Sequence, residues 1–160
     1  MKKMFFVLFV IGIVIFFGCG KNLPDTQACT NLSPNADSSA LLQYAHDSSI
    51  QVTRDSSGIF YKIIDSGNNL KPIFSSNITV NYVVRTMSGA LIDSASNSNL
   101  NGAGLYGLIP AWQIGLPKIG VGGEIIMLVP SALAYGCVGY PPVVTSNAPL
   151  YFDVKLLQVN

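Results

Sequence analysis

The sequence predicts an antiparallel α+β domain that is built mainly of strands and contains two short helices. From residue 50 onward, apolar residues tend to alternate with polar ones, which is the pattern of strands with one buried face. The centre of the chain offers one short helix-like segment, and stretches rich in glycine, proline, asparagine and serine separate the strand-like runs. The 160 residues contain no internal repeat, so we expect one folded domain.

The N-terminus has the features of an export signal. Two lysines precede a run over residues 4–17, of which thirteen are apolar. This run is shorter than the roughly 20 residues that cross a bilayer as a helix. It stops at Gly18-Cys19, which resembles the end of a bacterial lipoprotein signal, although Phe16 replaces the usual leucine. We therefore expect residues 1–18 to be a lipoprotein signal peptide and Cys19 to be lipidated. The protein would then be anchored to a membrane of the bacterial cell envelope, facing the periplasm or the exterior. The alternative is an ordinary cleaved signal followed by an incidental cysteine.

A spacer and a short helix follow the signal. Residues 19–36 are rich in asparagine, proline, serine and threonine without periodicity, and we expect them to form a flexible tether. Asp37-Ser38-Ser39 offers N-cap chemistry before an apolar segment, which predicts an N-terminal helix within residues 37–50. His46 would lie near the end of that helix, where the dipole favours a cation, so we do not expect it to be a ligand. The folded domain would extend over residues 51–160.

Turn residues divide that domain into strands. Gly58 closes a turn between two strand-like runs, and Ser88-Gly89 turns a third strand into a short fourth one. Residues 94–104 and 134–149 have loop compositions. Residues 112–119 fit a short helix or turn that ends at a glycine-rich segment. We expect strands over residues 50–54, 59–65, 77–86, 90–93, 124–130 and 150–159.

Composition excludes several classes of function. The formal net charge is +1 and there is no basic run, so we expect no nucleic-acid partner. One histidine and three scattered cysteines give no metal-ligand spacing, and the parts of phosphate loops and of Ser-His-Asp chemistry are missing, so we expect neither metal nor cofactor. Cys29 and Cys137 would lie where disulfides persist, and the sequence leaves open whether they are bridged or remain two thiols.

Six segments of the domain follow one another in a characteristic order. They are Val80-Asn81-Tyr82, residues 88–94, Leu108-Ile109-Pro110-Ala111-Trp112, Val121-Gly122-Gly123-Glu124, residues 130–136 and residues 152–157. In order and spacing the chain resembles the FKBP-type peptidyl-prolyl isomerases over about residues 51–160. The preceding helix and hairpin are similar to an N-terminal extension on exported bacterial members. The resemblance implies a bent antiparallel sheet of five to six strands wrapped around one short helix.

The resemblance also implies an activity and its partners. The expected function is peptidyl-prolyl cis-trans isomerisation, in which an apolar pocket holds the proline and favours the twisted imide during folding of exported proteins. The substrates would be Xaa-Pro segments of unfolded or nascent exported proteins, and macrolide inhibitors of the family would be ligands. The alternative is a chaperone of the same fold that binds proline-containing or apolar segments with weak or no isomerase activity.

The resemblance assigns roles residue by residue. Trp112 would be the pocket floor, and the Ile109 N–H and the Tyr135 hydroxyl would bind substrate carbonyls. Asp93 would be a polar wall. The apolar walls would be Tyr82, Ile92, Leu108, Ile109 and Phe152, and Val143 and Val144 would belong to an overhanging loop. Without the order of the motifs, Tyr82, Ile92 and Phe152 would be taken as core residues.

Three positions depart from the family pattern. An aromatic usual on the strand before Leu108 is missing near Asn101 or Ala103, and Ile92 replaces a usual phenylalanine. Ala111 replaces the glycine usual before the tryptophan. With two rings missing, we expect a shallower and wetter pocket, with a weaker preference for bulky residues before proline and reduced turnover.

Overall fold

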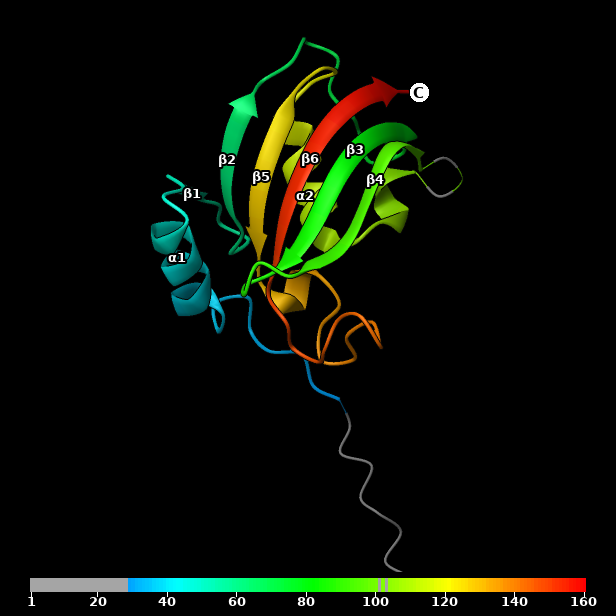
Figure 1. Cartoon of the computed structure of the whole chain (residues 1–160). Coiled ribbons are helices and arrows are strands. Elements are labelled where there is room, and N and C mark those ends of the chain that lie inside the picture. The colour runs from blue at the N-terminus through cyan, green and yellow to red at the C-terminus, as the bar shows by residue number, and fades with distance from the viewer. Residues whose placement is uncertain (1–28, 101, 103) are drawn as a thin grey trace, which may run out of the picture.

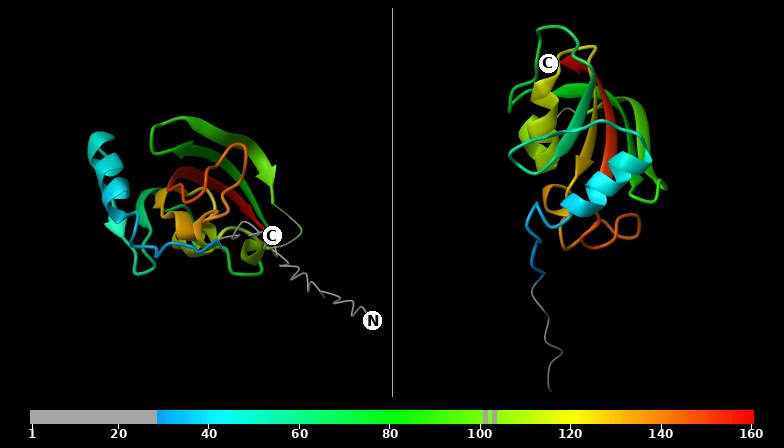
Figure 2. Two further views of the ribbon diagram at one scale, coloured as in Figure 1. Left: turned by 90° about the horizontal axis from the view of Figure 1, so that it is seen from below. Right: turned by 90° about the vertical axis from the view of Figure 1, so that its left-hand side faces the viewer.

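The computed structural model describes residues 29–100, 102 and 104–160. One antiparallel sheet curves around the short helix α2 (Pro110–Gly115), and a second helix, α1 (Ser38–Asp47), lies against the outer face of the sheet (Figures 1 and 2). The strands are β1 (Thr53–Arg54), β2 (Phe60–Asp65), β3 (Ile78–Thr86), β4 (Leu91–Asn99), β5 (Glu124–Val129) and β6 (Leu150–Val159), in the spatial order β1-β2-β5-β6-β3-β4. Three single 3₁₀ turns complete it: η1 (Leu105–Gly107), η2 (Leu116–Lys118) and η3 (Ser131–Leu133). The predicted fold class is confirmed.

Most predicted elements lie within a few residues of the observed ones. The first hairpin is present, because β1 pairs with β2 and Gly58 takes a positive φ of 102° in the turn between them. Strand β6 has the predicted bounds. Helix α2 begins two residues earlier than predicted, since Pro110 at its first position has no N–H to satisfy and a φ that suits the first turn.

The predicted loop over residues 94–104 is wrong at its start, because β4 continues to Asn99. The backbone of β4 pairs with β3 along this stretch, and the ladder does not depend on apolar side chains. The asparagine-rich part of β4 contains a β-bulge. Asn97 takes a positive φ of 52° there, and its N–H donates to Asn81 Oδ1 at 2.8 Å. Since β4 is the edge of the sheet, its polar side chains remain in solvent.

The N-terminal predictions have mixed outcomes. The predicted helix is present as α1, which buries Leu41 and Ala45 against Phe60 and Leu128 on the outer face of the sheet. The predicted tether is wrong for its described part, because residues 29–36 make hydrogen bonds to the domain, including one from Arg54 to Asn35 at 2.6 Å. The expected signal peptide and Cys19 lie outside the described residues. Among the residues described, no helix has the length and apolar character of a membrane span.

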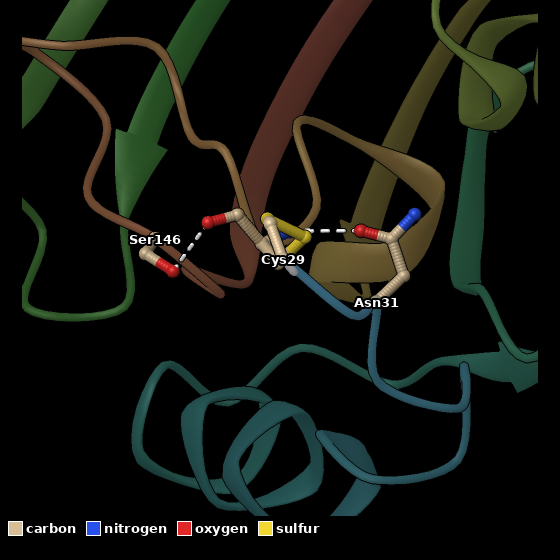
Figure 3. The surroundings of a disulfide bond; sticks show 4 residues. Cys29, Asn31 and Ser146 are labelled. Atoms are coloured by element: carbon tan, nitrogen blue, oxygen red, sulfur yellow. Dashed lines mark hydrogen bonds between the residues drawn. A yellow bond between two sulfur atoms is a disulfide. The ribbon is translucent and has the colours of Figure 1, made fainter. Parts of the chain in front are cut away.

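A disulfide joins Cys29 to Cys137, with 5.6 Å between their Cα atoms (Figure 3). Of the two alternatives that the sequence leaves open, the structure therefore has the bridged one. The bond links the start of the described chain to the loop between β5 and β6.

The main core lies between α2 and the inner face of β3, β5 and β6. Alternate residues of these strands point inward, as Val84, Phe152 and Met127 do, and are almost completely buried. Gly115 of α2 packs so closely on the sheet that a Cβ there would overlap Met127 Sδ. This close approach holds the helix against the inner face of β5 and positions the preceding Trp112.

Candidate functional site

An apolar pocket of about 200 Å³ opens between α2 and the inner face of the sheet. Its walls come from β3, β4, β6, the segment before α2, and the loop after η3. The lining residues are Tyr82, Val84, Ile92, Asp93, Leu100, Leu108, Ile109, Trp112, Tyr135 and Phe152. Drug-sized ligands usually occupy roughly 300–1,000 Å³, so this pocket suits a single ring or side chain.

Two larger hollows lie elsewhere and are less suited to an apolar group. One, of about 440 Å³, lies on the outer face of the sheet and includes Glu124, Asp153 and Lys155. The other, of about 500 Å³, lies between α1 and the turn that joins β3 to β4. Both are more open than the pocket beside α2 and have a larger polar share of their lining, whereas that pocket is lined mainly by aromatic and aliphatic side chains.

Aromatic rings form the base of the pocket. Trp112 is only 6% exposed, and its indole meets the ring of Tyr82 edge-on at 5.6 Å and the ring of Phe152 edge-on at 6.1 Å. Trp112 is at the third position of α2, which directs its side chain at the sheet rather than at solvent. Its Nε1–H finds no acceptor among the described residues. The base therefore combines an apolar ring surface with one unused donor.

Two tyrosines provide neutral donors at the rim. The Tyr82 hydroxyl donates to Asp93 Oδ2 at 2.7 Å. Burial, followed by this hydrogen bond and the negative charge of Asp93, raises the pKa of Tyr82 to about 12. Burial also raises the pKa of Tyr135, with Asp93 and Tyr140 adding to the effect. Both phenols consequently stay protonated at neutral pH.

The segment before α2 presents a backbone donor to the pocket. The Ile109 carbonyl accepts the N–H of Trp112 at 3.0 Å, while the Ile109 N–H makes no hydrogen bond to another described residue. Gln113, a residue of α2, fixes this segment, because its Nε2 donates to the Leu108 carbonyl at 2.7 Å and to the Tyr106 carbonyl at 3.0 Å. The Leu108–Ile109 peptide is thus fixed in orientation with its N–H available.

Eight of the ten residues expected at the site line this pocket, and the other two are Val143 and Val144. Two wall residues, Val84 and Leu100, are missing from the sequence-based set. Val84 continues the alternation of Val80 and Tyr82 and could have been found from it. Leu100 could not, because it follows a stretch that has the composition of a loop.

The late loop differs from expectation. Val144 is 2% exposed and belongs to the core, and Val143 is 48% exposed. Neither is among the residues that line the pocket, and a role for them in a loop over the pocket stays a prediction. The expected aromatic gap at Asn101 or Ala103 falls outside the described residues.

The arrangement suits binding and conformational chemistry. Within residues 29–100, 102 and 104–160, no group of histidine, cysteine, aspartate and glutamate side chains could hold a metal ion. The pocket can surround an apolar ring while neutral N–H and O–H groups orient adjacent carbonyls. Such a site can change the rotational state of a bound amide without transferring a proton.

Comparison with known proteins agrees with this geometry. The family model of the FKBP-type peptidyl-prolyl cis-trans isomerases matches residues 71–157. The chain is 37% identical over 114 residues to the isomerase FkpA of Escherichia coli (strain K12), covering 68% of this chain and 40% of FkpA. It is 31% identical over 126 residues to the peptidyl-prolyl cis-trans isomerase Mip of Coxiella burnetii (strain RSA 493 / Nine Mile phase I), covering 78% of this chain and 55% of Mip.

The solved structures show the same fold. The crystal structure of FkpA from Escherichia coli matches with a TM-score of 0.68 and 32% identity, over 79% of this chain and 61% of that one. The chain spans 40% to 55% of the length of these curated relatives. The family match includes the pocket-lining residues from Tyr82 to Phe152. On the sequence match, the fold and the pocket together, the chain belongs to the FKBP-type peptidyl-prolyl cis-trans isomerase family.

Proposed function

We propose that this protein catalyses cis-trans isomerisation of Xaa-Pro bonds and thereby assists the folding of exported proteins. The observation that carries the proposal is the apolar pocket based on Trp112, in which neutral donors from Ile109 and Tyr135 lie around a space for one ring. The alternative is a chaperone of the same fold that binds such segments without useful catalysis.

The reaction needs a pocket rather than a reactive group. Resonance gives the peptide bond partial double-bond character and a rotational barrier of about 20 kcal/mol, while cis and trans Xaa-Pro differ by only about 0.5–1 kcal/mol. Rotation breaks the resonance, so the twisted imide carries less charge separation than the planar one. A dry apolar pocket consequently favours the twisted state over the planar one, which lowers the barrier.

Each wall of the pocket has a part in this proposal. The proline ring would lie on Trp112, between Tyr82 and Phe152. The Ile109 N–H and the Tyr135 hydroxyl would donate to the carbonyls that flank the proline. The 2.7 Å hydrogen bond from Tyr82 would hold the Asp93 carboxylate in a fixed orientation at the polar wall of the pocket. Ile92, Leu108, Val84 and Leu100 would complete the apolar wall and contact the residue before proline.

The size of the pocket limits how a macrolide would bind. We propose the macrolide inhibitors of the family as ligands, with one ring in the pocket. Because the pocket holds only about 200 Å³, most of a macrolide would lie over its rim. Rim residues such as Tyr135 and Ile109 would then decide the affinity.

The proposed setting is the bacterial cell envelope. We infer that residues 1–18 are removed, that Cys19 is lipidated, and that the domain faces the periplasm or the exterior. The apolar run that ends at Gly18-Cys19 supports this inference, as does the Cys29–Cys137 disulfide, since disulfides persist in oxidising compartments. Expression of the full chain in a bacterium, followed by mass spectrometry of its N-terminal peptide, tests it. An acylated Cys19 is expected, and an unmodified Cys19 or cleavage elsewhere would refute the anchor.

Refolding of a client separates the two candidate functions. Folding steps limited by proline isomerisation take about 10–100 s without a catalyst. The protein (residues 20–160), added in less than equimolar amount, should speed the slow refolding phase of a client that is limited by proline isomerisation. The refolding rate of a proline-free client should stay unchanged. Tight binding of both clients with no acceleration would refute the isomerase and favour the chaperone.

A further inference from the structure

The first described residues of the chain lie along the loop that carries Tyr135. We name residues 29–37 the N-terminal strap and residues 131–137 the pocket loop. Although Cys29 and Cys137 are 108 positions apart, the two segments lie side by side at one end of the sheet (Figures 1 and 3). The contacts between them are made at both ends of the pocket loop.

At the start of the pocket loop, the strap provides a carboxylate. Asp37 Oδ2 accepts two hydrogen bonds from Ser131, one from its N–H and one from its hydroxyl, each at 2.7 Å. Ser131 is completely buried. Asp37 is the N-cap residue of α1, but its side chain makes no capping hydrogen bond. Its carboxylate therefore binds the pocket loop and not the start of the helix.

At the end of the pocket loop, Cys137 is held from three directions. Its sulfur is bonded to Cys29, its N–H donates to Asn31 Oδ1 at 2.9 Å, and its carbonyl accepts the Ser146 hydroxyl at 2.5 Å (Figure 3). The strap approaches so closely that a Cβ on Gly136 would overlap the side-chain oxygen of Asn31. Two of these three contacts come from the strap.

Tyr135 lies between these two fixed points. Its ring lines the pocket and packs on Tyr140 at 5.5 Å, and its hydroxyl makes no hydrogen bond to another described residue. The place of that hydroxyl is therefore set by the backbone on either side of Tyr135 together with the packing of its ring. We propose that the strap is a positioning element of the site: Asp37, Asn31 and the Cys29–Cys137 bond act through the pocket loop to place the Tyr135 hydroxyl for the substrate carbonyl.

This role rests on the proposed isomerase function, but its physical part can be measured separately. The pocket loop contains internal hydrogen bonds, such as the one from the Gly136 N–H to the Ser131 carbonyl at 2.8 Å. When the strap contacts are removed, these amides should open more often. Hydrogen exchange followed by mass spectrometry reports that opening whether or not the protein is active.

The test uses residues 20–160 with Asn31→Ala, Asp37→Ala and the pair Cys29→Ser/Cys137→Ser. Each should raise exchange in residues 131–137 and lower kcat/KM for an Xaa-Pro peptide. Asn31→Ala removes one hydrogen bond and should lower kcat/KM by about 3- to 10-fold. Asp37→Ala, which removes two hydrogen bonds, and the loss of the disulfide should lower it by at least as much. Asn31→Asp and Asp37→Asn keep an acceptor oxygen and should restore most of the activity. Asn68→Ala is the matched control, because Asn68 Oδ1 also accepts a backbone N–H, that of Leu70 at 2.8 Å, in a turn remote from the pocket loop.

A double-mutant cycle distinguishes positioning from general destabilisation. If Asn31 acts through Tyr135, Asn31→Ala should cost little in kcat/KM once Tyr135→Phe is present. Equal losses in both backgrounds would overturn the proposal, as would unchanged exchange in residues 131–137. If Asp37→Ala does not fold, the exposed Asn31 and the cysteine pair still decide the outcome. A wild-type protein without isomerase activity would refute the proposed function, and the exchange result would still decide whether the strap orders the pocket loop.

Discussion

Tyr82→Phe removes a single oxygen from the rim of the pocket and leaves the ring that packs on Trp112. The lost contact is the 2.7 Å hydrogen bond from the Tyr82 hydroxyl to Asp93 Oδ2. Hydrogen bonds to charged groups contribute about 1.5–3 kcal/mol, and we expect the lower end or less because Asp93 is exposed to solvent. The free energy of unfolding should fall by about 1 kcal/mol or less.

The effect on activity follows from the position of Asp93. Without its donor, the Asp93 carboxylate loses its fixed orientation, and kcat/KM for an Xaa-Pro peptide should fall by about 3- to 5-fold, corresponding to roughly 1 kcal/mol of transition-state stabilisation. Protease-coupled or NMR exchange kinetics measure this directly. Tyr106→Phe is a matched control, because the Tyr106 side chain is 57% exposed, stacks on Phe74, and does not line the pocket.

A cycle with Asp93→Ala tests the reasoning. Because Tyr82 is expected to act through Asp93, the double variant should be no slower than Asp93→Ala alone. Additive losses, or a Tyr82→Phe variant as fast as the wild type, would refute the proposed role of this hydrogen bond.

Three further predictions concern the wall, the pH profile and the acid stability. Leu100→Ala should lower kcat/KM about 5-fold for a peptide with leucine before proline and leave an alanine peptide unchanged, whereas equal losses would remove Leu100 from the substrate contacts. Because burial raises the pKa of Tyr82 to about 12 and also raises that of Tyr135, kcat/KM should be constant from about pH 6 to 9, and a transition near pH 8 would contradict this. Lys118 Nζ, 2.7 Å from Asp55 Oδ2, and the Ser57 N–H lower the pKa of Asp55 from 3.8 to about 2. The stability from this pair is therefore present above pH 3.8 and is lost as the pH falls through 2, so Asp55→Asn should cost about 1–2 kcal/mol at pH 7 and much less at pH 2 in urea unfolding. A cost that does not change with pH would refute this.

The strands were predictable where one face is buried. The alternation of Val80, Tyr82 and Val84 marks β3, and the apolar run after the loop that ends at residue 149 marks β6. The second half of β4 was not predictable, because its polar side chains lie in solvent at the edge of the sheet and its pairing depends on the backbone. A bulge at Asn97 further breaks the period of two.

The pocket was predictable because its residues belong to motifs in a recognisable order. Trp112, Tyr82 and Phe152 meet in the structure although they come from three separate elements. Contacts between segments that are far apart in the sequence could not be predicted, because neither segment alone shows which other segment it meets in the fold. Asp37 is one of three adjacent residues that could cap α1 from sequence, and only its position beside Ser131 in the fold shows that its side chain bonds there instead. The Cys29–Cys137 bond is of the same kind, since sequence does not give the distance between two cysteines.

Isomerisation of a short Xaa-Pro peptide by residues 20–160, with Trp112→Leu alongside, tests the central claim most directly. Trp112 is the single tryptophan of the chain and forms the base of the pocket. The wild type should catalyse the conversion well above the uncatalysed rate, and Trp112→Leu, shown to be folded by circular dichroism, should lose at least about tenfold in kcat/KM. A folded wild type with no catalysis would contradict the isomerase function, and a Trp112→Leu variant with full activity would contradict the proposed pocket.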